Sequence, residues 1–280
     1  MSKHHEGKTK PFSLLFFISV ITLSLIVLFG LVWLIAPEVW NVQTSASITS
    51  LCVVIVVVHL INSFVEFFFH RYVLHAPVVP FLAYFYKQHT LHHSLTRIRL
   101  KNVSQEGGQE VENLYPILEE EQYEASYFPP YSLLVFAFLA TPPLALLQWR
   151  FPEAPFFLGG YLAVAFSLVL YETLHALEHL PIEKWKPLLD HKVYGKMWKV
   201  LYGFHLRHHA DIHSNESISG FFGFPVPDVI LGTYKKPDSL FEHRKPGEKE
   251  WFASPQPVFF IRWLDHLAKK SVEHRRITAR

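Results

Sequence analysis

Four long apolar runs divide the 280-residue chain, at residues 12–36, 46–69, 131–149 and 155–177. Each run holds about twenty residues with almost no charge, which is the length a helix needs to cross a hydrocarbon core of about 30 Å. Polar residues fill the stretches between the second and third runs and after the fourth. The pattern predicts an all-α fold: a multi-pass membrane protein with about four transmembrane helices and a cytoplasmic helical cap.

The third run is interrupted by Pro142 and Pro143. Each proline removes a backbone donor from a helix and crowds the preceding turn. One kinked span and a pair of half-helices that enter the membrane and return both fit this sequence.

The basic residues indicate the orientation. With the N-terminus in the cytoplasm, the two outer loops contain only Arg150, and the other 25 of the 26 Lys and Arg residues lie inside, as the positive-inside rule requires. We expect a bacterial inner membrane or endoplasmic reticulum protein with its active site on the cytoplasmic face. The expected parts are a cytoplasmic tail (1–11), a transmembrane hairpin (12–69), a cytoplasmic segment (70–130), a second transmembrane hairpin (131–178) and a cytoplasmic region (179–280). In the last region, residues 185–202 and 259–270 are amphipathic and are expected along the membrane surface.

Composition adds one unusual feature. The formal net charge is only +2, so nothing indicates a nucleic-acid partner. Histidine, in contrast, occurs 18 times, and ten histidines form clusters that all fall on one side of the membrane in the predicted topology. The clusters are His70 and His75; His89, His92 and His93; His175 and His179; and His205, His208 and His209.

The spacing within these clusters is typical of metal ligands. Residues three and four apart share a helix face, so the members of each of the last three clusters are expected to point in one direction. His70 and His75 are five apart, so we expect the chain to bend there. Ten imidazoles suit two transition metals better than one, and imidazole binds iron, zinc, copper and nickel, so the residues alone leave the metal open.

The order HxxxxH, HxxHH, HxxxH, HxxHH, with an apolar hairpin between the second and third boxes, resembles the fatty acid hydroxylase and sterol desaturase superfamily of integral-membrane di-iron oxygenases. The sequence "NESISGFFGFPVPDVILGTY" after the last box is similar to that family's Asn, Gly, Asp and Gly-Thr pattern. The resemblance covers roughly residues 55–235, and residues 97–127 have no counterpart in it.

This resemblance implies an oxidoreductase: an O2-dependent lipid hydroxylase (monooxygenase) in which the ten histidines hold two Fe2+ ions. The substrate would be a C–H bond of a fatty acyl, sterol or related lipid, and a desaturase of the same superfamily is the alternative. Zinc can replace iron in purified material. The sequence has no dinucleotide fingerprint and no cysteine cluster, so a separate ferredoxin-like or cytochrome-like electron donor is implied.

Several polar residues lie near the boxes. Glu66 and Glu172 each precede a box histidine by about one turn, so each either accepts a hydrogen bond from an imidazole or caps a helix end in water. His213 and Asn215 are further candidates for supporting the ligands, with Asp211 and Asp228. His59 lies about 16 Å deeper than His70, and an interhelical hydrogen bond is favoured for it.

Two other classes of function remain open. A divalent-metal transporter is also membrane-bound and rich in histidine, but its ligands normally lie near the bilayer midplane. In a non-enzymatic membrane protein, metal ions bound by the clusters would only hold the helices together and stabilise the fold.

Overall fold

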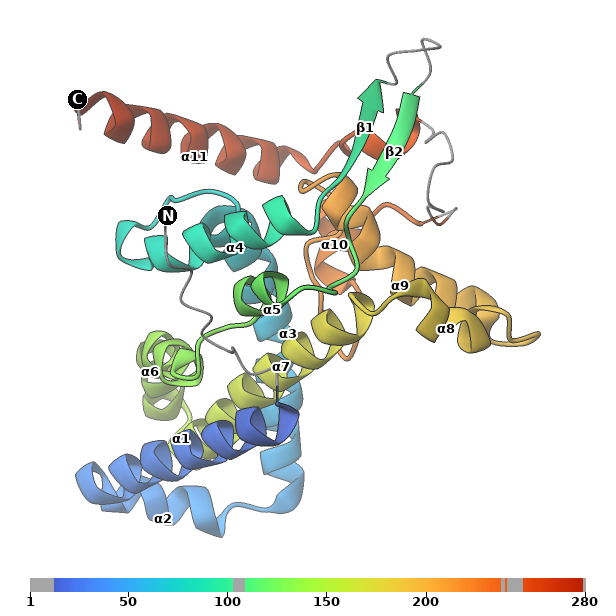
Figure 1. Ribbon diagram of the computed structural model, residues 1–280. Helices are drawn as coiled ribbons and strands as arrows, with labels where there is room; N and C mark the ends of the chain where they lie inside the picture. The colour runs from blue at the N-terminus through green and yellow to red at the C-terminus, as the bar shows by residue number, and fades with distance from the viewer. Residues whose placement is uncertain (1–12, 103–108, 238–239, 241–248, 279–280) are drawn as a thin grey trace, which may run out of the picture.

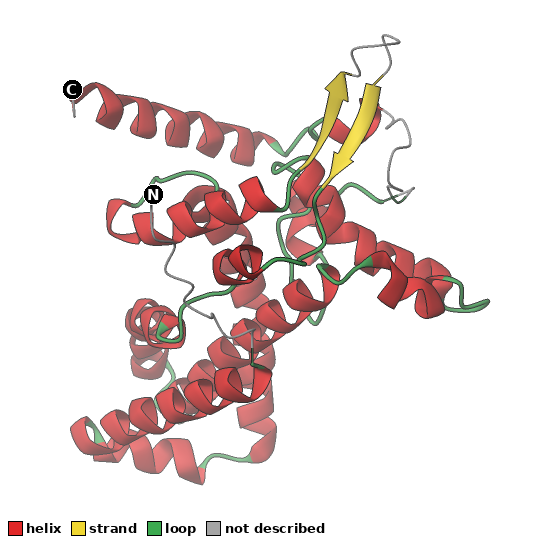
Figure 2. Cartoon of the chain, in the orientation of Figure 1, coloured by secondary structure: helices red, strands yellow, loops and turns green. Residues whose placement is uncertain are grey.

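The structure is a computed structural model that describes residues 13–102, 109–237, 240 and 249–278. The α-helices are α1 (Leu14–Ile35), α2 (Pro37–Ser45), α3 (Ile48–Phe69), α4 (Ala83–Leu95), α5 (Glu120–Ser126), α6 (Ser132–Arg150), α7 (Phe156–Glu178), α8 (Ile182–Leu189), α9 (Gly195–Ala210), α10 (Val226–Leu231) and α11 (Phe259–Thr278). The shorter elements are the π-helix η1 (His70–Leu74), the 3-10 turns η2 (Pro80–Leu82) and η3 (Lys249–Phe252), and the strands β1 (Ile98–Asn102) and β2 (Gln109–Asn113). The all-α prediction is confirmed, and the antiparallel β1–β2 hairpin is a minor addition to it (Figure 2).

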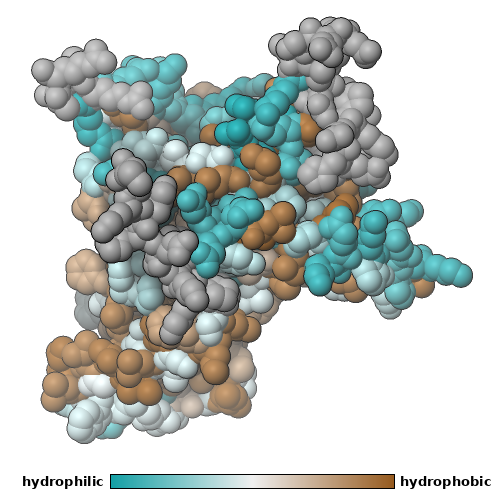
Figure 3. Space-filling view, in the orientation of Figure 1, coloured by the Kyte–Doolittle hydropathy of each residue, from teal (hydrophilic) through white to brown (hydrophobic). Residues whose placement is uncertain are grey.

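In the part of the chain that the structure describes, four helices are long and apolar enough to cross a membrane: α1, α3 with η1, α6 and α7. Their outward side chains are largely hydrophobic and exposed, and brown surface covers the lower part of the molecule in Figure 3. Exposed apolar surface of this extent is typical of helices that face lipid. The protein is therefore a multi-pass membrane protein.

Helix α7 is the centre of the membrane layer, because α1, α3 and α6 all pack against it (Figure 1). Two adjacent glycines allow this. A Cβ atom on Gly159 would lie 2.6 Å from Val54 of α3, and one on Gly160 would lie 2.5 Å from Leu144 of α6. Any larger residue would push the helices apart.

The connection between the first two spans, residues 37–45, forms helix α2. Its buried Gln43 accepts hydrogen bonds from the backbone N–H groups of Phe157 and Leu158 at the free N-terminus of α7. The third span is one continuous helix, α6, through Pro142 and Pro143, so the pair of half-helices is wrong.

Helices α4, α5 and α8–α11 and the β-hairpin form a cap at one end of the membrane layer, and α2 lies at the opposite end (Figure 1). Tyr115, Trp185, Tyr202, Leu206 and Trp251 form the core of this cap. The amphipathic segments 185–202 and 259–270 fold as parts of α8, α9 and α11, and their position on a membrane surface stays a prediction. The predicted tail, residues 1–11, lies outside the described residues.

Candidate metal centre

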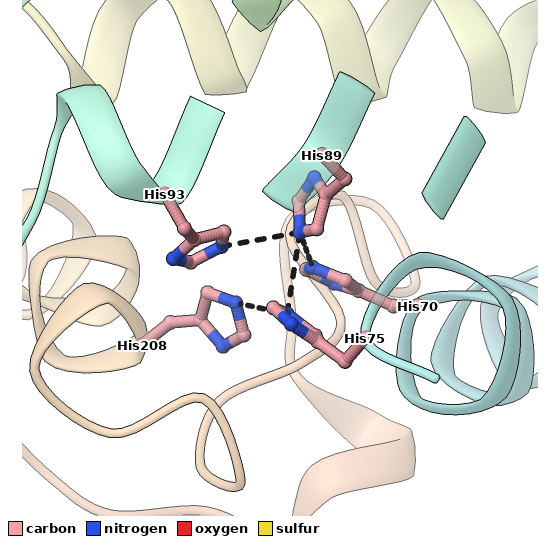
Figure 4. Close-up of side chains that lie close together, drawn as sticks. All are labelled: His70, His75, His89, His93 and His208. Atoms are coloured by element: carbon pink, nitrogen blue, oxygen red, sulfur yellow. Dashed lines mark hydrogen bonds between the residues drawn. The ribbon is translucent and has the colours of Figure 1, made fainter. Parts of the chain in front are cut away.

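All ten clustered histidines converge where the cap meets the membrane layer. They form two groups in which the nearest ring nitrogens all lie within 4.8 Å of one another. The first group is His70, His75, His89, His93 and His208, drawn in Figure 4. The second group is His92, His175, His179, His205 and His209.

Each HxxHH box is divided between the two groups, which corrects the expectation that its members point in one direction. On α4, His89 and His93 are one turn apart and belong to the first group, whereas His92 belongs to the second. On α9 the arrangement is reversed, with His205 and His209 in the second group and His208 in the first. Each of the two helices therefore supplies histidines to both groups.

His70 and His75 are brought together by the π-helix η1 rather than by a bend at the following prolines. The His75 N–H donates to the His70 carbonyl at 3.0 Å, which is the i→i+5 bond of a π-turn. In this geometry residues five apart come onto the same face, and the two imidazole rings stack with centroids 4.9 Å apart. The π-helix explains why an HxxxxH box can supply two ligands to one group.

The spacing between Nε2 atoms fits metal coordination. In the first group the distances are 2.9 Å from His70 to His89, 3.1 Å from His93 to His89 and 3.0 Å from His75 to His208. In the second group they are 3.1 Å from His205 to His179 and 3.0 Å from His209 to His205. Two ligands at right angles on a metal, with bonds of about 2.1 Å, lie about 3.0 Å apart. Each group can therefore hold one metal ion.

The opposite nitrogen, Nδ1, is held by the protein in five of these histidines. The Nδ1–H groups donate to backbone carbonyls or to a serine hydroxyl: His70 to Glu216 at 2.6 Å, His179 to Tyr115 at 2.7 Å, His208 to Ser214 at 2.8 Å, His209 to Thr96 at 3.0 Å and His92 to Ser126 Oγ at 2.8 Å. This fixes the tautomer, so the Nε2 lone pair is available to a metal.

Burial also keeps the imidazoles neutral. It lowers the pKa of His179 to about 3, and it lowers the pKa values of His89 and His205 well below their usual range, with neighbouring histidines adding to the effect for these two. Neutral imidazole is the form that binds metal. The two groups are in contact, since the rings of His93 and His209 stack with centroids 4.1 Å apart. The arrangement is compatible with a centre of two metal ions.

The loop that follows α9 supports the first group. Both oxygens of the buried Asp228 carboxylate accept backbone N–H groups, from Glu216 and Ser217, each at 2.8 Å. These bonds hold the carbonyl of Glu216 against His70. Asn215, expected to support a ligand directly, instead ties the backbone carbonyls of Phe204 and Lys235 together from a left-handed conformation with φ of 53°.

Thr96, Tyr115 and Ser126 support the second group, a role that no pattern in the sequence indicates. Their two carbonyls and the Ser126 hydroxyl hold three of the histidines, and Tyr115 and Ser126 belong to residues 97–127, the segment without a counterpart in the family pattern. The Tyr115 ring also packs on His179, with centroids 4.3 Å apart. Two of these three contacts use backbone atoms, which no residue pattern reveals.

The two carboxylates expected near the ligands bind other groups. Glu66 accepts a hydrogen bond from the Ser219 N–H at 2.7 Å, and Glu172 accepts one from the Phe128 N–H at 2.9 Å. Neither binds an imidazole in the described part of the chain, so the hydrogen bond to a box histidine, one of the two roles that the sequence left open, is wrong for both. His213 is exposed beside Asp211, whose carboxylate accepts the His213 backbone N–H at 3.3 Å.

His59 makes the interhelical hydrogen bond that the sequence favours. Its Nε2 accepts the Phe222 N–H at 3.1 Å, so its Nδ1 carries the proton and donates to Ser167 of α7 at 2.9 Å. Outside the boxes, His191 and His274 are exposed, and His243 lies outside the described residues.

A cavity of about 280 Å³ lies in the membrane layer between α3, α6 and α7. Its lining is mostly apolar, with Asn62, Glu66, Ser167 and Ser219 as polar members, and one end reaches His70 of the first group. We call it the membrane cavity. Helices α3 and α6 both pack on α7 but barely touch each other, so the cavity lies along the seam between them.

Comparison with known proteins gives no further assignment: no family model, curated protein or solved structure matches the chain.

Proposed function

We propose that this membrane protein is an O2-dependent lipid hydroxylase with a di-iron centre, of the fatty acid hydroxylase and sterol desaturase type. The membrane cavity is the observation that carries the proposal, because it leads from the lipid-facing layer to His70. An enzyme that oxidises an alkyl chain must bring it to the metal and keep water away, and an apolar cavity that ends at a ligand serves both needs.

The ligand set supports metal chemistry. Five neutral imidazoles converge in each group, and the protein fixes the second nitrogen, Nδ1, in five of the ten. Among the metals that imidazole binds, zinc has no redox chemistry, so oxidation of a C–H bond favours iron. When bound, two Fe2+ ions would supply the electrons that activate O2.

The proposed reaction breaks a C–H bond and forms a C–O bond. One oxygen atom of O2 enters the lipid as a hydroxyl group and the other leaves as water, with two electrons and two protons from outside. The electrons come from a separate one-electron carrier, ferredoxin-like or cytochrome-like, with its reductase.

The chain's own residues bind the lipid and exclude water. Ile61 and Val65 on α3 and Leu139 on α6 are exposed and line the seam, so a lipid can enter sideways from the bilayer. Phe69, Phe128 and Phe136 surround the end near the metals, and their rings contact one another. This aromatic wall separates the reacting carbon from bulk water.

Sidedness belongs to the same proposal. The basic residues favour a cytoplasmic position for both termini and for the cap, in either a bacterial inner membrane or the endoplasmic reticulum. Electron carriers of the expected class would then reach the cap from the cytoplasm.

The test is lipid analysis of cells that express the protein with iron, under normal and isotopically labelled O2. We expect a lipid heavier by one oxygen atom, with the label incorporated, that is missing in cells expressing His93→Ala or His209→Ala. A lipid lighter by two hydrogens would identify a desaturase instead. An unchanged lipid profile with iron-loaded protein and a working electron donor would contradict the proposal.

A further inference from the structure

A continuous series of aromatic rings connects the second histidine group to the surface of the cap. Tyr115 packs on two ligands of this group, with ring centroids 4.3 Å from His179 and 5.1 Å from His209. Three further ring contacts, with centroids 6.2, 5.4 and 6.3 Å apart, lead outward from Tyr115. We call the series the aromatic relay, and its members, in order from the ligands, are Tyr115, Tyr202, Trp185 and Trp198.

The aromatic relay ends where α8 and α9 meet the solvent. Its three inner members are at most 5% exposed, whereas Trp198 is half-buried. The next residue of α9, Lys199, is exposed. A soluble molecule can therefore reach the outer end of the relay but not its inner rings.

Every member of the relay can lose an electron. Tyrosine and tryptophan are the aromatic side chains that are oxidised most easily, whereas phenylalanine resists oxidation. Around the first histidine group the aromatic rings at the membrane cavity are mainly Phe69, Phe128 and Phe136. Tyr171 also packs on a ligand, His175, with centroids 5.6 Å apart, but in the described part of the chain its next ring is Phe128. A path of oxidisable rings to the surface therefore starts from the second group.

The two tyrosines pass an electron deficit on rather than keep it, because an oxidised phenol is stable only after it has lost its proton. The Tyr115 hydroxyl is buried and has no hydrogen-bond partner among the described residues, and burial raises the pKa values of Tyr115 and Tyr202 above their usual range. Tryptophan can lose an electron and keep its proton. The Trp185 Nε1–H donates to the Leu177 carbonyl at 3.0 Å, which stabilises positive charge on the indole.

We propose that the aromatic relay returns single electrons to the metal centre when O2 has oxidised the metals and no lipid is bound. For each electron that moves inward, the centre is reduced by one electron and Trp198 is oxidised, and Trp198 releases its indole proton to water. A soluble thiol then gives a hydrogen atom to Trp198, which restores the indole and leaves a thiyl radical in solution.

The relay would protect the site, because an oxidised centre without substrate attacks its own imidazole ligands. The inference rests on the proposed function for the source of the oxidant. Electron transfer along the relay does not itself need O2, so it can be measured separately.

A photo-oxidant attached to the cap tests the relay without O2. In the full-length variant Cys52→Ala/Lys199→Cys, the only thiol lies next to Trp198 in the sequence and is labelled with a ruthenium bipyridyl maleimide. The protein, loaded with Fe2+ and free of oxygen, is flashed with a quencher that takes one electron from the excited ruthenium. The oxidised ruthenium should draw an electron through the relay, and freeze-quench electron paramagnetic resonance should detect a mixed Fe2+/Fe3+ pair.

Trp185→Phe interrupts the relay with a ring that resists oxidation, so the fast formation of Fe3+ should be lost. Trp263→Phe is the matched control, because Trp263 is exposed on α11 and outside the relay, and it should form Fe3+ at the wild-type rate. Metal content and thermal unfolding of both variants show that the site and the fold are kept. Equal rates in Trp185→Phe and the wild type, or no Fe3+ in the wild type, would overturn the inference.

Reaction with O2 in the absence of lipid tests the protective role. Mass spectrometry should find oxygen added to Trp198 in the wild type, and to Tyr115 and His179 in Trp185→Phe; the same modified residues in both proteins would contradict that role. Fe3+ after the flash, with no lipid oxidised under O2, would refute the hydroxylase and leave the relay intact. Lipid oxidation with equal flash rates in Trp185→Phe and the wild type would refute the relay and leave the hydroxylase intact.

Discussion

The buried ion pair of Arg71 and Glu216 provides a quantitative prediction. Arg71 follows the ligand His70, and its side chain is 6% exposed, whereas that of Glu216 is fully buried. One guanidinium nitrogen contacts the Glu216 carboxylate, and two others bind both oxygens of Asp265 on α11 at 2.7 Å. The pair therefore connects the π-helix, the loop after α9 and the C-terminal helix.

The two single variants should differ. Arg71→Met leaves the Glu216 carboxylate buried without its partner, which costs about 3–5 kcal/mol. Glu216→Met leaves Arg71 with Asp265, which is 35% exposed and remains a partner, so the loss should be smaller. The double variant Arg71→Met/Glu216→Met removes both buried charges, so neither is left without its partner. It should therefore be more stable than Arg71→Met alone.

Thermal unfolding of the purified protein in one detergent, at one scan rate, measures this order. At roughly 2–4 °C per kcal/mol for a chain of this size, Arg71→Met should lower the apparent midpoint by about 10 °C. Arg150→Met is the matched control, because Arg150 is exposed, and it should change the midpoint little. A double variant no more stable than Arg71→Met would refute the stranded-charge argument.

Three further predictions concern the metal centre and the helix packing. His93→Ala and His209→Ala each remove one ligand from a different group, so plasma mass spectrometry should find about one metal ion per chain instead of two. The control variant His191→Ala changes an exposed histidine and should keep both metal ions. Equal losses of metal in all three variants would indicate general instability. Removing the metals with a chelator should lower the apparent melting temperature, and restoring Fe2+ should raise it again. The reason is that a ligand that binds only the folded state stabilises that state. An unchanged melting temperature would contradict a metal site in the folded protein. Gly160→Ala should lower the free energy of unfolding by about 1–3 kcal/mol, because its Cβ would lie 2.5 Å from Leu144. Gly30→Ala places its Cβ where nothing lies within 4 Å, so it should be neutral or stabilising in thermal unfolding. The reverse order of stability would contradict the tight contact between α6 and α7.

The membrane layer could be predicted from the sequence because hydropathy over about twenty residues is a strong signal. The four predicted runs match α1, α3, α6 and α7 to within a few residues. The continuity of α6 through Pro142 and Pro143 was not predictable from the sequence. It depends on whether neighbouring helices and side chains satisfy the backbone groups that the prolines leave without a hydrogen bond.

The ten candidate ligands could also be identified from their spacing, but their division into two groups could not. Adjacent histidines such as His92 and His93 point about 100° apart on any α-helix. Which histidines of the other elements each of them joins depends on how those elements pack, and the sequence does not show that. The π-turn that unites His70 and His75 has no sequence signature. Glu66 and Glu172 were candidates for imidazole bonds because each lies about one turn before a box histidine. The backbone carbonyls of Glu216 and Tyr115 support the ligands instead, and every residue carries a carbonyl.

The metal content of the wild-type protein tests the central claim most directly. Protein purified without oxygen from iron-supplemented cells should contain two iron ions per chain by plasma mass spectrometry, because each of the two histidine groups can hold one ion. A chain that binds one metal ion or none under these conditions would contradict the assignment of the ten histidines to a di-metal centre.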